Sequence, residues 1–202
     1  MNKFHSAALS LALATGLWIL VFLVRPFNFW VMLSLSTLLL MAISILVNRE
    51  RITGHLSFRW LLLGVLSGIG LYLFFYAGFV LTKSIPIFNE GIAHVYNFRA
   101  ATPSVMIAIL LLLPISPGEE IYWRGLIQRR FMERIGGRAG FLFTASAYAL
   151  VHLPTLNLPL ILTALIGGLA WGYIYKATGS LVPTIISHVL FDLLIFVIAP
   201  FS

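Results

Sequence analysis

Residues 60–81 read WLLLGVLSGIGLYLFFYAGFVL, a stretch of 22 residues without a charged side chain. A helix needs about 20 mostly apolar residues to cross the hydrocarbon layer of a membrane, so this stretch is long enough to span it. Apolar runs of similar character recur along the chain, at residues 6–24, 29–47, 103–128, 140–153, 159–175 and 181–199. We therefore predict an all-α fold, a polytopic transmembrane helical bundle of about seven spans.

The composition of the 202-residue chain supports this prediction, because 60% of the residues are hydrophobic and only 9% are charged. Soluble globular proteins carry about 25% charged residues, so an ordinary soluble domain is excluded. The chain has no cysteine, which excludes a disulfide framework, an Fe–S cluster and a thiolate nucleophile. Any catalysis must therefore use carboxylate, imidazole or hydroxyl groups.

The formal net charge of +7 is interpreted as a topology signal, because no soluble domain is left to carry a nucleic-acid surface. With seven alternating spans, one side of the membrane collects Lys3, Arg49, Arg51, Arg59, Arg129, Arg130, Arg134, Arg138 and Lys176. The other side collects only Arg25, Lys83 and Arg99. The positive-inside rule then predicts a multi-pass protein of a bacterial-type inner or cell membrane, in contact with lipid, with a cytoplasmic N-terminus.

Neither a repeat nor a linker divides the sequence, so we expect a single transmembrane domain over residues 1–202. The predicted spans within residues 1–102 contain no charged side chain in their cores and are interpreted as scaffold or gating helices. Residues 103–202 are interpreted as the catalytic helices, because all the intramembrane ionisable groups lie there. The polar segments 48–59 and 83–101 are interpreted as loops between helices, and an extra helix near residues 88–98 is left open.

Six ionisable side chains fall inside the predicted spans: Glu119, Glu120, Arg124, His152, His188 and Asp192. Such groups are costly in a membrane and usually face the interior of the bundle at a functional site. At 1.5 Å per residue, the carboxylates and imidazoles among them lie about 10–18 Å from the ends of their spans. We therefore expect three different helices to bring them together in one layer.

The two neighbouring carboxylates are expected to differ in role. Glu120 and Arg124 are spaced i, i+4 with the acid first, the favourable order for an ion pair within a helix. Glu119 has no such partner and is left free to bind a water molecule as a general base. Two prolines and Gly118 predict a break or a kink in this span, with Ser116 capping a restarted helix. If the helix restarts in this way, Glu119 lies three residues after the cap, and its alternative role is to accept from the backbone N–H of the cap.

His188 and Asp192 form a second i, i+4 pair, in which the carboxylate selects the tautomer of the imidazole. His152 follows Tyr148 by one helical turn, so the two rings are expected to pack together. The residues Glu119, His152, His188 and Asp192 are also chemically able to bind zinc. A water molecule activated by Glu119 and His152 requires no metal, so no cofactor is favoured, and zinc remains the alternative.

Three motifs, taken in order, resemble a known family. Residues 119–124, EEIYWR, match Glu-Glu-x-x-x-Arg; residues 148–152, YALVH, resemble Phe-x-x-x-His; and residues 188–192, HVLFD, match His-x-x-x-Asn/Asp. Together they resemble the CPBP intramembrane proteases, named for CAAX-type proteases and bacteriocin-processing enzymes and also called Abi proteins. The resemblance covers residues 114–199. Tyr148 replaces the usual Phe, and Asp192 stands where the CAAX-processing relatives carry Asn.

The resemblance implies an intramembrane endopeptidase that acts on a protein or peptide substrate. Glu119 would activate water with the help of His152, and His188 with Asp192 would stabilise the oxyanion. Glu120, Arg124 and Tyr148 would support them. Members of the family have been described both as metalloproteases and as metal-free glutamic proteases, and both types stay open here. A prenylated C-terminus, a leader peptide and a membrane-anchored signalling protein are all candidate substrates.

Two further classes of function use the same residues. A proton-coupled carrier would employ the acids and histidines as a relay, although we find no inverted repeat. A noncatalytic membrane protein, such as an immunity or scaffold factor, would keep the residues without turnover.

Overall fold

The computed structural model describes residues 3–48 and 56–201, and within these residues the chain is helical without a β-strand. Arg49, Arg51 and the side chain of Lys3, assigned above to the basic side, lie outside the description. The helices are α1 (Lys3–Ile19), α2 (Phe29–Asn48), α3 (Phe58–Thr82), α4 (Pro86–Tyr96), α5 (Ser104–Leu110), α6 (Ser116–Tyr122), α7 (Arg129–Ile135), α8 (Gly137–Leu150), α9 (Leu158–Thr178) and α10 (Val182–Leu193).

Five helical segments are long and apolar enough to cross a membrane: Phe4–Val24, Phe29–Val47, Phe58–Thr82, Ser104–Ile135 and Leu158–Thr178. The apolar segment Val182–Ile198 is shorter, and α8 has 14 residues. The predicted helical membrane bundle is confirmed. Within the described residues the structure thus has five candidate spans and one shorter apolar segment, fewer than the expected seven or so.

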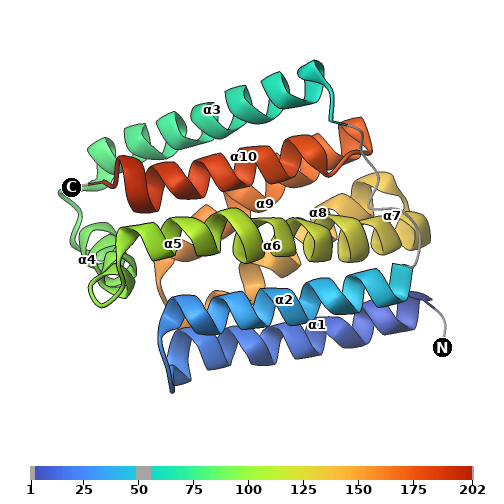
Figure 1. Cartoon of the computed structure of the whole chain (residues 1–202), viewed down its shortest axis with the longest axis horizontal. Coiled ribbons are helices and arrows are strands. Elements are labelled where there is room, and N and C mark those ends of the chain that lie inside the picture. Colours follow the sequence, from blue (N-terminus) through green and yellow to red (C-terminus); the bar gives the residue numbers. More distant parts are fainter. Residues whose placement is uncertain (1–2, 49–55, 202) are drawn as a thin grey trace.

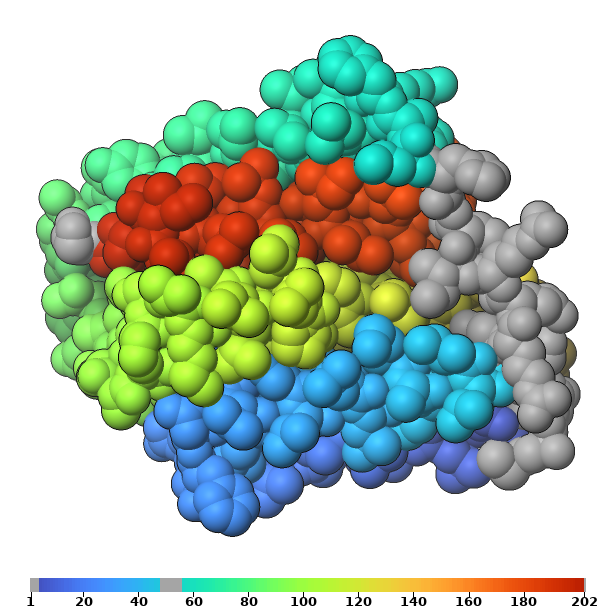
Figure 2. All heavy atoms as spheres, in the orientation of Figure 1, coloured from blue at the N-terminus to red at the C-terminus, as the bar shows by residue number. Residues whose placement is uncertain are grey.

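The segment from α5 to α7 runs through the centre of the bundle (Figure 1). It is continuous because π-helical turns at Leu111–Ile115 and Trp123–Gln128 join α5, α6 and α7. α6 contacts α2 on one side and α10 on the other, and α3 packs against α10. Figure 2 shows α2, the central segment and α10 side by side on this face of the molecule. The centre of the bundle is therefore the segment that carries Glu119 and Glu120.

The interpretation of residues 83–101 as a loop is wrong, because this segment contains the helix α4. Pro86 occupies the first turn of α4, where its missing N–H costs nothing. The amide of Asn157 donates to the carbonyl oxygen of Gly91 at 2.8 Å, which attaches α4 to the segment before α9. Figure 1 shows α4 at the end of the bundle where α5 begins. With 11 residues, α4 is too short for the span criterion that the sequence suggested.

The predicted capping box at Ser116 is also wrong, and the chain does not break at this point. The helix passes Pro114 in a π-helical turn, and Ser116 is already a helical residue of α6. Its hydroxyl donates to Asp192 Oδ2 at 2.7 Å instead of capping a helix end. A helix can accommodate proline in a membrane when neighbouring groups and local π adjustments satisfy the freed backbone. Glu119 is therefore not needed as a capping residue.

Candidate active site

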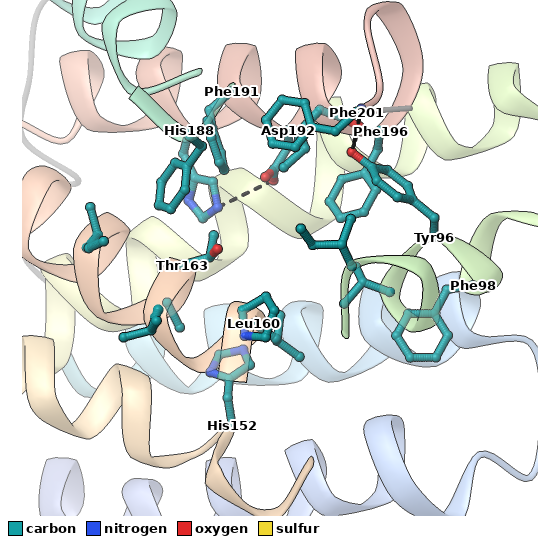
Figure 3. A pocket seen from close by; sticks show the side chains of 18 of the residues that line it. Tyr96, Phe98, His152, Leu160, Thr163, His188, Phe191, Asp192, Phe196 and Phe201 are labelled. Carbon is teal, nitrogen blue, oxygen red and sulfur yellow. Dashed lines mark hydrogen bonds and ion pairs between the residues drawn. The ribbon is translucent and has the colours of Figure 1, made fainter. Parts of the chain in front are cut away.

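A partly open cavity of about 350 Å³ lies between the helices of the bundle. Apolar and aromatic side chains form most of its wall. Its polar lining includes Glu119 from α6, Tyr148 from α8, His152 from the segment after α8, and His188 and Asp192 from α10. Figure 3 shows His152 facing the cavity from the wall opposite to His188 and Asp192. The prediction that three helices bring these groups into one layer is therefore confirmed.

Glu119 is 7% exposed, and its carboxylate has one partner among the described residues. The hydroxyl of Tyr148 donates to Glu119 Oε2 at 2.6 Å. Nothing in residues 3–48 and 56–201 donates a hydrogen bond to the other oxygen, Oε1. Because Glu119 lines the cavity, this oxygen is the acceptor available to a water molecule.

Glu120 is fully buried and connects two of the motifs. Its Oε1 accepts from Arg124 Nη1 at 2.8 Å, which confirms the predicted ion pair. The same oxygen lies 2.8 Å from His188 Nδ1 on α10. Glu120 therefore orients His188, a contact that the sequence spacing did not indicate. Arg124 is also buried, and its Nη2 donates to the carbonyl oxygen of Gly168 on α9 at 3.3 Å.

His188 lies between two carboxylates, because its other nitrogen, Nε2, is 3.3 Å from Asp192 Oδ2. The predicted pair of His188 with Asp192 is thus confirmed. Asp192 Oδ2 also accepts from the hydroxyl of Ser116 on α6. The indole of Trp171 stacks on the imidazole of His188 with 3.7 Å between ring centroids and 16° between the ring planes. The orientation of the imidazole is therefore fixed by the carboxylates at its ring nitrogens and by the indole stacked on its face.

His152 is 6% exposed and has a partner at each ring nitrogen. Trp18 Nε1 donates to His152 Nε2 at 3.0 Å, and an indole N–H is a donor only. His152 Nε2 must therefore be unprotonated, so Nδ1 carries the proton and donates to the carbonyl oxygen of Tyr148 at 2.8 Å. The predicted packing of the Tyr148 and His152 rings is confirmed, with 5.5 Å between their centroids.

Sequence reasoning missed three residues of this site: Trp18, Ser116 and Trp171. Trp18 lies in α1, in the half of the chain interpreted as scaffold or gating helices. The sequence pattern assigns Ser116 to a helix cap and does not single out Trp171 of α9. Each contacts a partner on another element, and one sequence without an alignment carries no signal for such contacts. The only signal for Trp18 and Trp171 is chemical: a buried indole N–H usually finds a hydrogen-bond partner.

The zinc alternative requires at least three ligands that converge on one point. Among the residues that the structure describes, no group of three His, Asp or Glu side chains is placed to hold a metal ion. The contacts given above are hydrogen bonds and ion pairs between these side chains. The described side chains thus show no ready ligand set for zinc, and no step below is derived through a metal.

The comparison with protein families gives one match: residues 99–194 match the family described as Rce1-like, type II CAAX prenyl endopeptidase Rce1-like. The matched segment includes Glu119, Glu120, Arg124, Tyr148 and His152, together with His188 and Asp192. It ends within the turn that follows α10 and excludes α1, α2, α3 and α4. Comparisons with curated proteins and with solved structures give no match.

Proposed function

Because residues 99–194 match the Rce1-like family of type II CAAX prenyl endopeptidases, we propose that the chain is an intramembrane endopeptidase of the CPBP type with Glu119 as its general base. The substrate would be a membrane-associated or C-terminally processed protein or peptide. One observation carries the proposal. Carboxylates and imidazoles from α6, α10 and the end of α8 line one cavity whose remaining wall is mostly apolar.

The reaction begins with a water molecule at Glu119 Oε1. Glu119 accepts a proton from this water while the water oxygen forms a bond to the carbonyl carbon of the peptide, and the carbonyl electron pair moves onto the oxygen. When the tetrahedral intermediate collapses, the C=O bond re-forms and the C–N bond breaks. Glu119 returns its proton to the leaving nitrogen. Protons and electrons balance without another reactant.

His188 supplies the stabilisation of the oxyanion. Its Nε2 contact with Asp192 is long, at 3.3 Å, and contacts in unliganded sites often tighten or rearrange when substrate binds. A donor fixed in advance at the developing negative charge is worth about 100- to 1,000-fold in kcat. Glu120 and Trp171 hold the His188 ring. His152 lies at the other wall, where Trp18 and the Tyr148 carbonyl occupy both of its ring nitrogens, so it assists the water only if the bond from Trp18 is exchanged for a bond to the water.

The test is cleavage of a library of peptides and membrane-anchored proteins by the purified full chain. Glu119→Gln keeps the size of the side chain and removes the base, so we expect cleavage to fall by at least about 100-fold. Glu90→Gln is the matched control, because Glu90 is an exposed glutamate of α4 outside the cavity lining. Cleavage by Glu119→Gln at the wild-type rate would overturn the role of Glu119.

Each reaction is also run with a strong chelator. Cleavage that requires Glu119 and continues in the chelator is the expected result. Loss of cleavage in the chelator, with recovery on addition of zinc, would assign the reaction to the metallopeptidase alternative. If the wild-type chain cleaves no member of the library, the result would favour a noncatalytic membrane protein, such as an immunity or scaffold factor. Flux that depends on a pH gradient in liposomes would favour the carrier.

A further inference from the structure

We propose that the hydroxyl of Tyr148 is a positioning group that holds the Glu119 carboxylate in its reactive orientation. The inference rests on the proposed function of Glu119 and adds a residue whose hydroxyl had no assigned part. In the sequence, Tyr148 stood out only as an aromatic ring beside His152. The structure adds a hydrogen bond between this side chain and the Glu119 carboxylate in the wall of the cavity.

The bond between the two residues is short. The distance of 2.6 Å from Tyr148 Oη to Glu119 Oε2 lies within the range of 2.5–2.7 Å typical of a hydroxyl that donates to an ionised carboxylate. Both side chains are buried, at 6% and 7% exposure. Such a bond is stronger in a low-dielectric interior than in water, so it is able to fix a carboxylate.

Contacts on several sides hold the tyrosine itself in place. Trp123 packs on its ring with 5.2 Å between centroids at 69°, and His152 packs at 5.5 Å and 81°. The Arg124 guanidinium carbon lies 5.0 Å from the ring centroid. The backbone carbonyl of Tyr148 accepts from His152 Nδ1. The hydroxyl is thus attached to a ring with little freedom to rotate.

The consequence concerns the two oxygens of Glu119. Tyr148 occupies Oε2 and stops the carboxylate from rotating, so Oε1 stays directed to the water site. The bond also ties α8 to α6, since the two residues lie on these two helices. A phenylalanine at position 148 would keep the ring contacts and lose this function. The hydroxyl is therefore separable from the packing of the ring by a single substitution.

The first test compares Tyr148→Phe with wild type on a substrate that the library identifies. We expect kcat to fall by about 10- to 100-fold with KM within about twofold, because misplacing a reacting group slows the chemical step. Tyr122→Phe is the matched control. Tyr122 is fully buried, its hydroxyl lies 3.2 Å from Ser10 Oγ, and it is outside the cavity lining. The control should retain wild-type kcat, whereas a merely structural role would alter KM and thermal stability without this split.

The second test needs no substrate. The full chain in detergent is treated with dicyclohexylcarbodiimide, an apolar reagent for carboxyl groups, and the adduct at Glu119 is quantified by mass spectrometry. In Tyr148→Phe both oxygens of Glu119 become accessible, so we expect labelling to be at least about threefold faster, in line with the loss of a hydrogen bond to a charged group. Tyr122→Phe should match wild type, and Glu119→Gln gives the blank.

The two tests separate failure of this inference from failure of the proposed function. Equal labelling of Glu119 in wild type and Tyr148→Phe would overturn the positioning role, and so would an unchanged kcat. Faster labelling in Tyr148→Phe, with no cleavage of any library member by wild type, would uphold the contact and contradict the protease. Faster labelling together with a selective loss of kcat supports both.

Discussion

Trp18 is the residue that most changes the expected chemistry of the site. Its indole N–H occupies the lone pair of His152 Nε2, so His152 is held with the proton on Nδ1. We predict that Trp18→Phe leaves Nε2 without a donor and destabilises the chain by about 1–3 kcal/mol. The ¹⁵N spectrum of histidine-labelled protein should show one His152 tautomer in wild type and a mixture in the variant.

The assignment of the His152 signals comes from a His152→Gln spectrum. Trp60→Phe is the control for tryptophan replacement, because Trp60 is half-buried at the start of α3 and is outside the cavity lining. It should leave the His152 signals unchanged. A wild-type spectrum with the proton on Nε2 would contradict the hydrogen bond from Trp18.

At the residue scale, the sequence predicts those contacts that depend on spacing within one helix. The pair of Glu120 with Arg124 and that of His188 with Asp192 follow from i, i+4 geometry, and both are present. The bonds of Tyr148 to Glu119 and of Trp18 to His152 span 29 and 134 residues. They depend on how helices pack against each other, which periodicity in a single sequence does not encode.

Among the helices, the contact of α3 with α10 determines where His188 and Asp192 lie. A Cβ atom added at Gly68 would lie 2.8 Å from the carbonyl oxygen of Ser187, the residue before His188. We therefore predict that Gly68→Ala separates α3 from α10, lowers the thermal unfolding midpoint and reduces cleavage. Small residues at such contacts let helices approach closely in membranes.

Gly70→Ala is the matched control, since a Cβ atom at Gly70 meets nothing within 4 Å. Alanine is a better helix former than glycine by about 1 kcal/mol, so this variant should be as stable as wild type or more stable. Thermal unfolding followed by tryptophan fluorescence measures both variants, with cleavage as the second readout. Equal behaviour of Gly68→Ala and Gly70→Ala would show that the close contact does not position α10.

At the scale of helices, the sequence predicts the long spans well, because a run of about 20 apolar residues has one stable solution in lipid. It leaves α4 only as an alternative to a loop, because the 11 residues of this helix lie below that length. It also predicts a helix cap at Ser116, where the helix instead continues from a π-helical turn that contains Pro114. Such a turn depends on neighbouring groups that satisfy the backbone, so tertiary packing decides it.

For the whole molecule, the remaining prediction is the orientation in the membrane. In Figure 1, the start of α1 and the junction of α7 with α8 lie at one end of the bundle. The turn between α1 and α2, helix α4 and the end of the chain that follows α10 lie at the other. Arg138 and Lys176 belong to the first end, and Arg25 and Lys83 to the second. The positive-inside rule makes the first end cytoplasmic.

The absence of cysteine from the sequence makes this orientation directly measurable. We predict that Ser84→Cys reacts with a membrane-impermeant maleimide in intact cells, and that Gly137→Cys reacts only after permeabilisation. Both positions are exposed, and neither substitution alters a charge that sets topology. The opposite labelling pattern would show that the chain has the reverse orientation. Lys83 and Arg99 would then face the cytoplasm, against the positive-inside rule. Equal labelling at both positions in intact cells would mean that the sparse charges of this chain, 9% of its residues, do not impose a single orientation.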